Sequence, residues 1–384
     1  LGVEARGVFA LIVTWSAVIV VVFNFGLNYS FQKEKSINGA GTIRYFARMA
    51  VLLSSVIFLL YGFAAAFWGW KDVKSLALLV SVFSLLRMQV AFIALIENFF
   101  KASLVNVVQA TLELSLLVLA FFYLKSDPFF AVLILCSKEL LGATANLILI
   151  RPAIKKESRQ GSERNAKISF LEIRENYLFT VLNIFFLKVV ILAYSLIGGT
   201  DSSVGILAIA IILAEYFWFF SDISKDVLTK TSSDNASVES IVKSVRLTIL
   251  LCIFGFFAYF LVGKWIVLML YGQSFSQSFS VSLILVVGVI GLIPYKLLSI
   301  KNISDGAVRE SNTSSALGFL IVLPVAVLMM YQYEIYGAAV SGALLYFSIG
   351  LLVALKFSKR HNIALRNIYI PRVSDFPLSQ KNVR

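Results

Sequence analysis

Charged side chains are scarce in this sequence. Asp, Glu, Lys and Arg make up 14% of its 384 residues, whereas an ordinary soluble domain has about 25%. There are two cysteines, Cys136 and Cys252, each inside an apolar run, and a single histidine, His361. Ligands this few and this scattered support neither a disulfide framework nor a Cys/His metal site. The sequence also lacks a Gly-rich phosphate loop and a G-x-S-x-G nucleophile motif, so we expect neither a cofactor nor an enzyme.

Apolar residues are abundant instead. They make up 59% of the sequence, and the mean hydropathy is +0.87. A transmembrane helix needs about 20 consecutive, mostly apolar residues, and lipid cannot satisfy the backbone groups of any open structure. We therefore predict an all-α, polytopic membrane protein with eleven visible transmembrane helices. The segments are 9–31, 45–69, 76–97, 103–124, 129–150, 176–197, 203–221, 247–270, 279–300, 313–331 and 337–357.

The basic residues indicate orientation. A net charge of +13 could suggest a nucleic-acid partner, but the Lys and Arg residues lie mostly between the apolar segments, so we expect none. Alternate loops and the C-terminal tail together hold 23 of them, and the opposite side holds five. By the positive-inside rule, this bias places the tail in the cytoplasm and Leu1 outside. With both ends inside, a complete protein would have twelve helices, the first of them preceding Leu1.

The most polar internal segment, 151–167, divides these twelve helices six and six. We predict that it is a basic cytoplasmic linker between two six-helix lobes around a central cavity. The lobes would then be 1–150, without its first helix, and 168–357, followed by a cytoplasmic tail at 358–384.

Several ionisable side chains fall inside the predicted spans. Such residues are costly in a bilayer and usually functional. The basic ones predicted to bind substrate in a cationic cavity are Arg87, Lys138, Lys188 and Lys296. The acidic ones, which could couple transport to an ion such as H⁺ or Na⁺, are Glu113, Glu139 and Glu215. A structural ion pair inside one lobe, such as Arg87 with Glu113, is the alternative. Because Lys and Arg attract phosphate strongly in a low dielectric, a cationic cavity indicates an anionic cargo.

Two stretches of the second half resemble a known family. They are Leu270-Tyr-Gly-Gln-Ser-Phe-Ser-Gln-Ser and Tyr331-Gln-Tyr-Glu-Ile-Tyr-Gly-Ala-Ala-Val-Ser-Gly-Ala. The opening Leu1-Gly-Val-Glu-Ala-Arg-Gly-Val-Phe-Ala-Leu and the Ser203-Val-Gly-Ile-Leu-Ala-Ile-Ala segment add to the likeness. Together they resemble the O-antigen (Wzx-type) polysaccharide flippases, whose superfamily also holds multidrug exporters and lipid II flippases.

The resemblance implies a flippase of the bacterial inner membrane. Its cargo would be an undecaprenyl-diphosphate-linked oligosaccharide repeat unit, carried from the cytoplasmic to the periplasmic leaflet by alternating access. Implied partners are membrane lipid and the polysaccharide polymerase machinery of lipopolysaccharide biosynthesis. Two alternatives stay open. One is a multidrug or small-solute exporter of the same fold, which would carry fewer intramembrane cations. The other is a membrane polysaccharide polymerase, against which the short outer loops argue.

Overall fold

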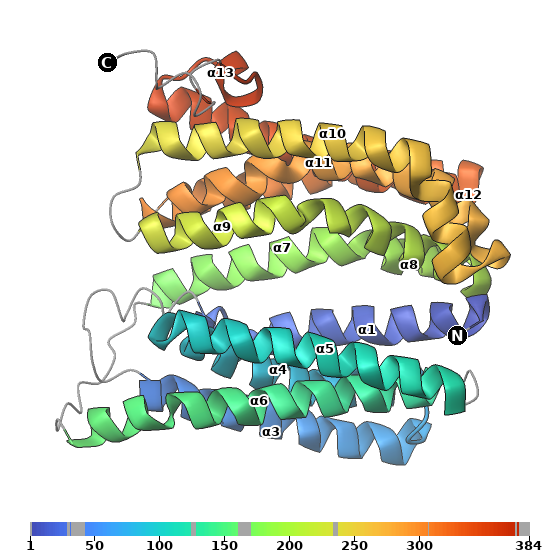
Figure 1. The fold of residues 1–384 in the computed structure, drawn as a ribbon, viewed down its shortest axis with the longest axis vertical. Helices are drawn as coiled ribbons and strands as arrows, with labels where there is room; N and C mark the ends of the chain where they lie inside the picture. Colours follow the sequence, from blue (N-terminus) through green and yellow to red (C-terminus); the bar gives the residue numbers. More distant parts are fainter. Residues whose placement is uncertain are drawn as a thin grey trace. The chain divides into compact units, whose positions relative to one another are not determined.

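The computed structural model describes residues 2–28, 31, 43–123, 128–159, 170–232, 237–305, 307–372 and 375. All the secondary structure in these ranges is helical (Figure 1). By its internal contacts the chain divides into two compact units, Leu1–Lys188 and Val189–Arg384. The predicted linker at 151–167 precedes this division. Its residues up to Arg159 continue a helix, and those from 160 onward lie outside the described ranges.

The first unit is built from long apolar helices. They are α1 (Val3–Asn24), α3 (Ile43–Trp68), α4 (Val73–Glu97), α5 (Phe99–Tyr123), α6 (Pro128–Arg159) and most of α7 (Phe170–Ile197). Helix α4 begins at Asp72, whose side chain accepts a hydrogen bond from the Lys74 backbone N–H at 2.8 Å. This N-cap satisfies one of the donors that a helix start leaves open.

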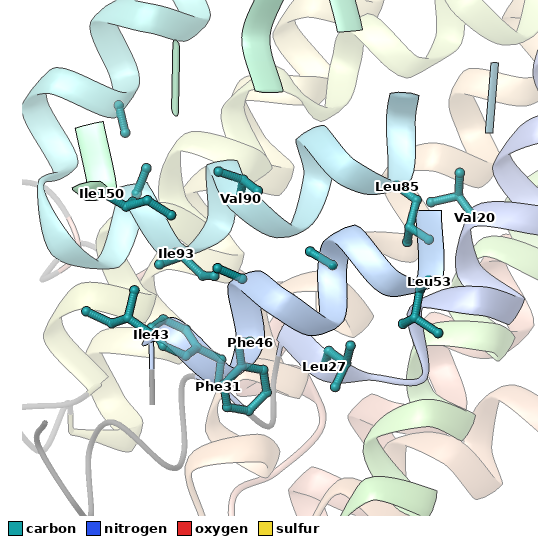
Figure 2. Close-up of a cluster of buried hydrophobic side chains, with 14 of the residues drawn as sticks. Val20, Leu27, Phe31, Ile43, Phe46, Leu53, Leu85, Val90, Ile93 and Ile150 are labelled. Atoms are coloured by element: carbon teal, nitrogen blue, oxygen red, sulfur yellow. The ribbon is translucent and has the colours of Figure 1, made fainter. Parts of the chain in front are cut away.

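Helix α4 lies at the centre of the packing in this unit. Figure 2 shows one buried cluster in which Leu85 of α4 lies near Leu53 of α3, and Ile93 of α4 lies nearer Ile150 of α6. Helix α1 is joined to α4 by a buried hydroxyl pair, in which Ser81 Oγ donates to Ser16 Oγ at 3.2 Å. The core therefore fixes α4 against α1, α3 and α6, and so fixes the positions of the polar side chains that α4 carries.

The second unit contains the C-terminal part of α7 and the remaining helices. They are α8 (Asp201–Glu215), η1 (Tyr216–Trp218), α9 (Phe219–Ser232), α10 (Val238–Tyr271), η2 (Gln273–Phe275), α11 (Ser276–Ser304), α12 (Val308–His361) and α13 (Arg366–Tyr369). Helix α12 is interrupted at Glu334, where φ is 48° and ψ is −123°. The interruption separates two helices of about 26 residues each, roughly 40 Å long at 1.5 Å per residue. That is enough to cross a bilayer once on each side of the interruption.

The fold class is confirmed as an all-helical, multi-pass membrane protein. Eight helices of the described chain are long and apolar enough to cross a membrane, and the two halves of α7 together make a ninth candidate. The described part of α5 contributes a shorter apolar helix, Phe99–Leu112. Each of the eleven predicted segments overlaps one of these helices, with α12 covering two of them. The count of eleven spans stays a prediction.

Helices α11 and α12 approach each other closely through glycines. A Cβ added at Gly350 of α12 would lie 1.9 Å from the carbonyl oxygen of Gly291 on α11. One added at Gly288 would lie 2.4 Å from the Cα of Ala343. Small residues let membrane helices come into backbone contact, where dispersion forces and weak hydrogen bonds hold them together. The α11–α12 pair is thus a rigid part of the second unit.

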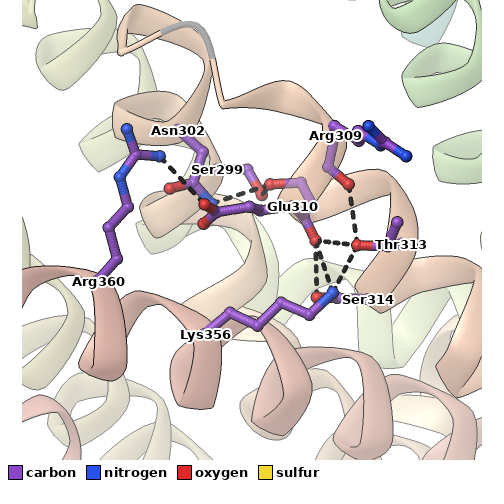
Figure 3. A network of polar contacts seen from close by, with 9 residues as sticks. Ser299, Asn302, Arg309, Glu310, Thr313, Ser314, Lys356 and Arg360 are labelled. Atoms are coloured by element: carbon purple, nitrogen blue, oxygen red, sulfur yellow. Dashed lines mark hydrogen bonds and ion pairs between the residues drawn. The ribbon is translucent and has the colours of Figure 1, made fainter.

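A polar network joins one end of α11 to both ends of α12 (Figure 3). Asn302 Nδ2 donates to Ser311 Oγ at 3.1 Å, and the Ser299 and Ser311 hydroxyls are 3.1 Å apart. Arg360 pairs with Glu310 at 3.6 Å. These contacts bind the start of α12 to its end as well as to α11.

A buried ion pair attaches the C-terminal segment to α10. Arg246 Nε donates to Asp375 Oδ2 at 2.6 Å, Nη2 donates to Oδ1 at 2.5 Å, and Nη1 donates to the Asn367 carbonyl at 2.6 Å. Arg246 and Asp375 are each 2% exposed. The backbone N–H of Arg372 also donates to Asp375. The predicted polar tail therefore begins inside α12, and its Asn367 and Asp375 contact Arg246 of α10.

Candidate functional site

Helices α8 and α9 are joined by a short 3₁₀ turn that lies beside a lysine of α11. The α-helical hydrogen bonding of α8 gives way at Tyr216–Trp218 to the 3₁₀ turn η1, and α9 continues from Phe219. The freed carbonyls find new donors, since Cys252 Sγ contacts the Phe217 oxygen at 3.2 Å and Ser221 Oγ donates to the Trp218 oxygen at 2.8 Å. Mid-helix 3₁₀ segments often mark functional sites, and membrane proteins tolerate broken backbone only where it is satisfied in this way.

Lys296 of α11 lies against this turn. Its Nζ is 4.3 Å from the ring centroid of Trp218 and donates to Asp222 Oδ1 of α9 at 2.6 Å. An ammonium over an indole face is a favourable cation–π geometry. The Lys296 side chain is 16% exposed and that of Asp222 is 54% exposed. The lysine is therefore held mostly inside the unit, with its counter-ion on the more accessible side.

Two further side chains complete the group. Tyr346 of α12 is buried, and its ring centroid lies 5.8 Å from that of Trp218. Glu215, the last residue of α8, stands three residues before Trp218, about one helical turn away. We call Glu215, Trp218, Asp222, Lys296 and Tyr346 the Lys296 cluster. It combines an ammonium, two carboxylates and two amphipathic rings, which can bind a polar or charged headgroup.

The first unit holds a separate ion pair. Arg87 Nη1 of α4 donates to Glu139 of α6, 3.1 Å from Oε1 and 3.2 Å from Oε2. The side chains are 26% and 8% exposed. An ion pair within one unit is thus realised between Arg87 and Glu139. The Glu113 side chain lies outside the described part of the chain.

The other predicted cations are half-buried. Lys138 precedes Glu139 on α6, and its backbone carbonyl accepts a hydrogen bond from Gln109 Nε2 of α5 at 3.1 Å. Lys188 of α7 is the last residue of the first unit. Arg87, Lys138 and Lys188 thus belong to one unit and Lys296 to the other. A cavity that they share stays a prediction, as do their roles in substrate binding.

Metal-ligating side chains do not gather in the parts of the chain described here. No group of three or more His, Cys, Asp or Glu side chains in those ranges could hold a metal ion. The acids predicted to couple an ion lie apart in sequence and unit, with Glu139 in the first and Glu215 in the second.

Comparison with known proteins identifies the fold. No protein-family model matches the chain, and no curated protein matches it significantly. Its structure is similar to an inward-facing multidrug resistance MATE family transporter of the MOP superfamily. That likeness has a TM-score of 0.60 and 14% identity, and covers 95% of this chain and 92% of the other. This chain has the fold of a MATE transporter.

Two further solved MATE structures match less well. The match to the eukaryotic transporter AtDTX14 has a TM-score of 0.49 at 13% identity. It covers 94% of this chain and 87% of AtDTX14. The match to the Vibrio cholerae transporter VcmN, in its bent form, has a TM-score of 0.49 at 14% identity. It covers 95% of this chain and 88% of VcmN.

Three members of the Lys296 cluster, Trp218, Asp222 and Tyr346, were not predicted from the sequence as site residues. Asp222 follows directly after the predicted span 203–221, so it counted as a loop residue. Its spacing held a signal, because Glu215, Trp218 and Asp222 stand at i, i+3 and i+7, which is one face of a helix. An apolar span of the MATE fold with such a polar stripe indicates a face turned toward protein or water rather than lipid.

The Arg87–Glu139 pair gives a first testable expectation. Glu139→Gln leaves the guanidinium within the membrane without its carboxylate, so the unfolding free energy should fall by about 2 kcal/mol. This value is below the 3–5 kcal/mol of a fully buried pair because Arg87 is a quarter exposed. Thermal unfolding of the full chain in detergent measures it. The control is Glu310→Gln, whose partner Arg360 lies 3.6 Å away with both side chains about one third exposed, so its change should stay below about 1 kcal/mol. If both variants lose the same unfolding free energy, the Arg87–Glu139 pair does not stabilise the fold more than a surface pair does.

Proposed function

We propose that this chain is a flippase that moves an undecaprenyl-diphosphate-linked oligosaccharide repeat unit from the cytoplasmic to the periplasmic leaflet. The observation that carries the proposal is Lys296, a lysine kept inside the second unit beside the 3₁₀ turn η1 between α8 and α9. Its ammonium is supported by Trp218 and neutralised by one half-exposed carboxylate. A lysine ammonium is a compact point charge that binds phosphate oxygens.

The fold is compatible with this role. A MATE-like chain of two compact units can expose a binding site alternately to the two sides of a membrane, while a prenyl tail remains in lipid. No covalent step is involved. In this proposal the protein lies in the bacterial inner membrane with its C-terminus in the cytoplasm. Arg87, Lys138 and Lys188 contribute to binding with Lys296, and H⁺ or Na⁺ at Glu139, Glu215 or Glu113 drives the cycle. Lipid and the polysaccharide polymerase machinery are its partners.

A second candidate function is export of small cationic compounds. Two observations favour it. The Lys296 cluster also contains the carboxylates of Glu215 and Asp222, and acidic groups inside a membrane bind cations. The similar structure with the TM-score of 0.60 is described as a multidrug resistance transporter. In this reading Lys296 keeps the acids in place and the cargo binds to them.

Replacing Lys296 separates the two functions. In cells that depend on this protein, Lys296→Ala should reduce the surface polymer at least ten-fold, because one charge-assisted contact with phosphate is worth about 1.5–3 kcal/mol. Mass spectrometry should show oligosaccharide-linked undecaprenyl diphosphate accumulating in the cytoplasmic leaflet. The matched control is Lys301→Ala. Lys301 lies on the same helix and forms an i,i+4 pair with Asp305. Cells with this variant should keep a normal amount of surface polymer.

Other outcomes identify the alternatives. Normal polymer together with greater sensitivity to cationic compounds, in cells lacking the protein, would replace the flippase by the exporter. Lipid-linked units accumulating in the periplasmic leaflet would indicate a polymerase.

A further inference from the structure

The two side chains of the Lys296–Asp222 ion pair differ in their exposure to solvent. Lys296 is 16% exposed, whereas Asp222 is 54% exposed and contacts the ammonium through Oδ1 alone. An ion pair with an exposed, flexible partner is weak, since solvent and other ions compete for it. The pair can therefore open by movement of Asp222 while Lys296 stays where it is.

Lys296 has a second support that does not depend on Asp222. Its Nζ lies 4.3 Å from the Trp218 ring centroid. Trp218 is itself fixed, being 6% exposed and 5.8 Å from the Tyr346 ring. The indole N–H of Trp218 is buried and has no acceptor among the described residues. An anion arriving at Lys296 thus meets an ammonium already positioned by the Trp218 ring.

We propose that Asp222 is a displaceable counter-ion that sets the anion selectivity of this site. Its carboxylate pairs with Lys296 while no cargo is bound. A phosphate oxygen of a diphosphate group then takes its place, and the carboxylate returns as the cargo leaves. Lys296 is never left unpaired in a low dielectric, where an isolated charge is most costly. The proposal rests on the anionic cargo of the proposed function.

Selectivity follows from the competition. An anion has to bind Lys296 better than a carboxylate does, so a doubly charged diphosphate succeeds where chloride or a single carboxylate does not. Asp222 also limits how tightly the diphosphate is held, because the freed carboxylate remains nearby and repels it. Release on the far side of the membrane is then faster than from an uncontested lysine.

The test is binding of inorganic pyrophosphate to the full chain in detergent, measured by isothermal titration calorimetry. Asp222→Asn removes the competing charge and keeps the side-chain shape, so the pyrophosphate Kd should fall about five- to ten-fold. Lys296→Met should abolish binding and Lys296→Arg should retain it. The matched control is Asp305→Asn, which removes the counter-ion of Lys301, 2.8 Å away and on the same helix. Its Kd should equal that of the wild type.

Each failure has its own meaning. If pyrophosphate binds the wild type through Lys296 but Asp222→Asn leaves Kd unchanged or raises it, Asp222 is a structural partner only. The counter-ion proposal is then wrong and the anionic cargo stands. If neither the wild type nor Asp222→Asn binds pyrophosphate, while Asp222→Asn weakens binding of a cationic dye such as ethidium, both proposals are wrong. If Asp305→Asn lowers the pyrophosphate Kd as much as Asp222→Asn does, the effect is a non-specific change of charge. That result would also contradict the role of Asp222 as the competing counter-ion.

Discussion

Asp375→Asn is expected to lower the unfolding free energy by about 3–5 kcal/mol, although Asp375 lies outside every candidate membrane span. The side chains of Arg246 and Asp375 are each 3% exposed, and both carboxylate oxygens accept from the guanidinium. The amide substitution removes the negative charge and replaces one acceptor by an NH2 donor, so the buried Arg246 keeps its charge with only neutral oxygens beside it, among them the Asn367 carbonyl. Unfolding of the full chain in detergent, followed by heat or denaturant, measures the loss.

The control for this substitution is Glu310→Gln. Its partner Arg360 lies 3.6 Å away, and the two side chains are about one third exposed, so the loss should be below 1 kcal/mol. An Asp375→Asn variant as stable as the wild type would show that the C-terminal segment does not stay on α10 in solution.

The same pair predicts a dependence on pH. The hydrogen bonds from Arg246 hold the pKa of the Asp375 carboxyl below its ordinary value of 3.8. The folded chain therefore binds this proton less readily than the unfolded chain does. The stabilisation is complete at neutral pH and is lost as the pH falls below about 3.8 through the lower, folded value. Between pH 5 and pH 3 the wild type should lose stability more steeply than Asp375→Asn.

Gly350→Ala should have the other large effect, a loss of about 3 kcal/mol, at the upper end of overpacking costs in cores. The added methyl would lie 1.9 Å from the Gly291 carbonyl oxygen. A backbone atom cannot turn aside as a side chain can, so α11 and α12 have to separate. Lys296 lies on α11 five residues beyond Gly291, so pyrophosphate binding should weaken as well.

Gly62→Ala is the matched control for this glycine. Both residues are inside long helices, but nothing lies within 4 Å of a Cβ added at Gly62. The stability of that variant should be unchanged or slightly raised, since Ala favours helix over Gly. If both variants unfold at the wild-type temperature, the close approach of α11 and α12 is not needed for stability.

The helices were predictable because each apolar run is long and few charges interrupt it. The side chains that pair with the intramembrane charges could not be predicted in the same way. Arg87 could be assigned to the membrane, but whether it meets Glu113 of the next helix or Glu139 depends on α4 packing along α6. Sequence order does not encode that choice, because helix neighbours are set by side-chain packing across the whole core.

The ends of helices explain the remaining misses. Asp222 was assigned to a loop because hydropathy falls after residue 221, although α9 continues to Ser232. Asp375 was assigned to a solvated tail because the segment is polar, whereas its charge is buried against Arg246. In both cases a polar residue is held by an oppositely charged one far away in the chain. Composition averaged over a window does not reveal such pairs.

The two ion pairs inside the membrane each lie within one unit, and this bears on how the chain is made. Arg87 and Glu139 are both synthesised before the second unit begins, and Asp222 precedes Lys296 by 74 residues. During translation, α4 and α6 can neutralise each other as soon as both have left the translocon. No charge of these two pairs has to wait in the bilayer for a partner from the other half. The order of the residues along the chain thus suits insertion and folding of one half after the other.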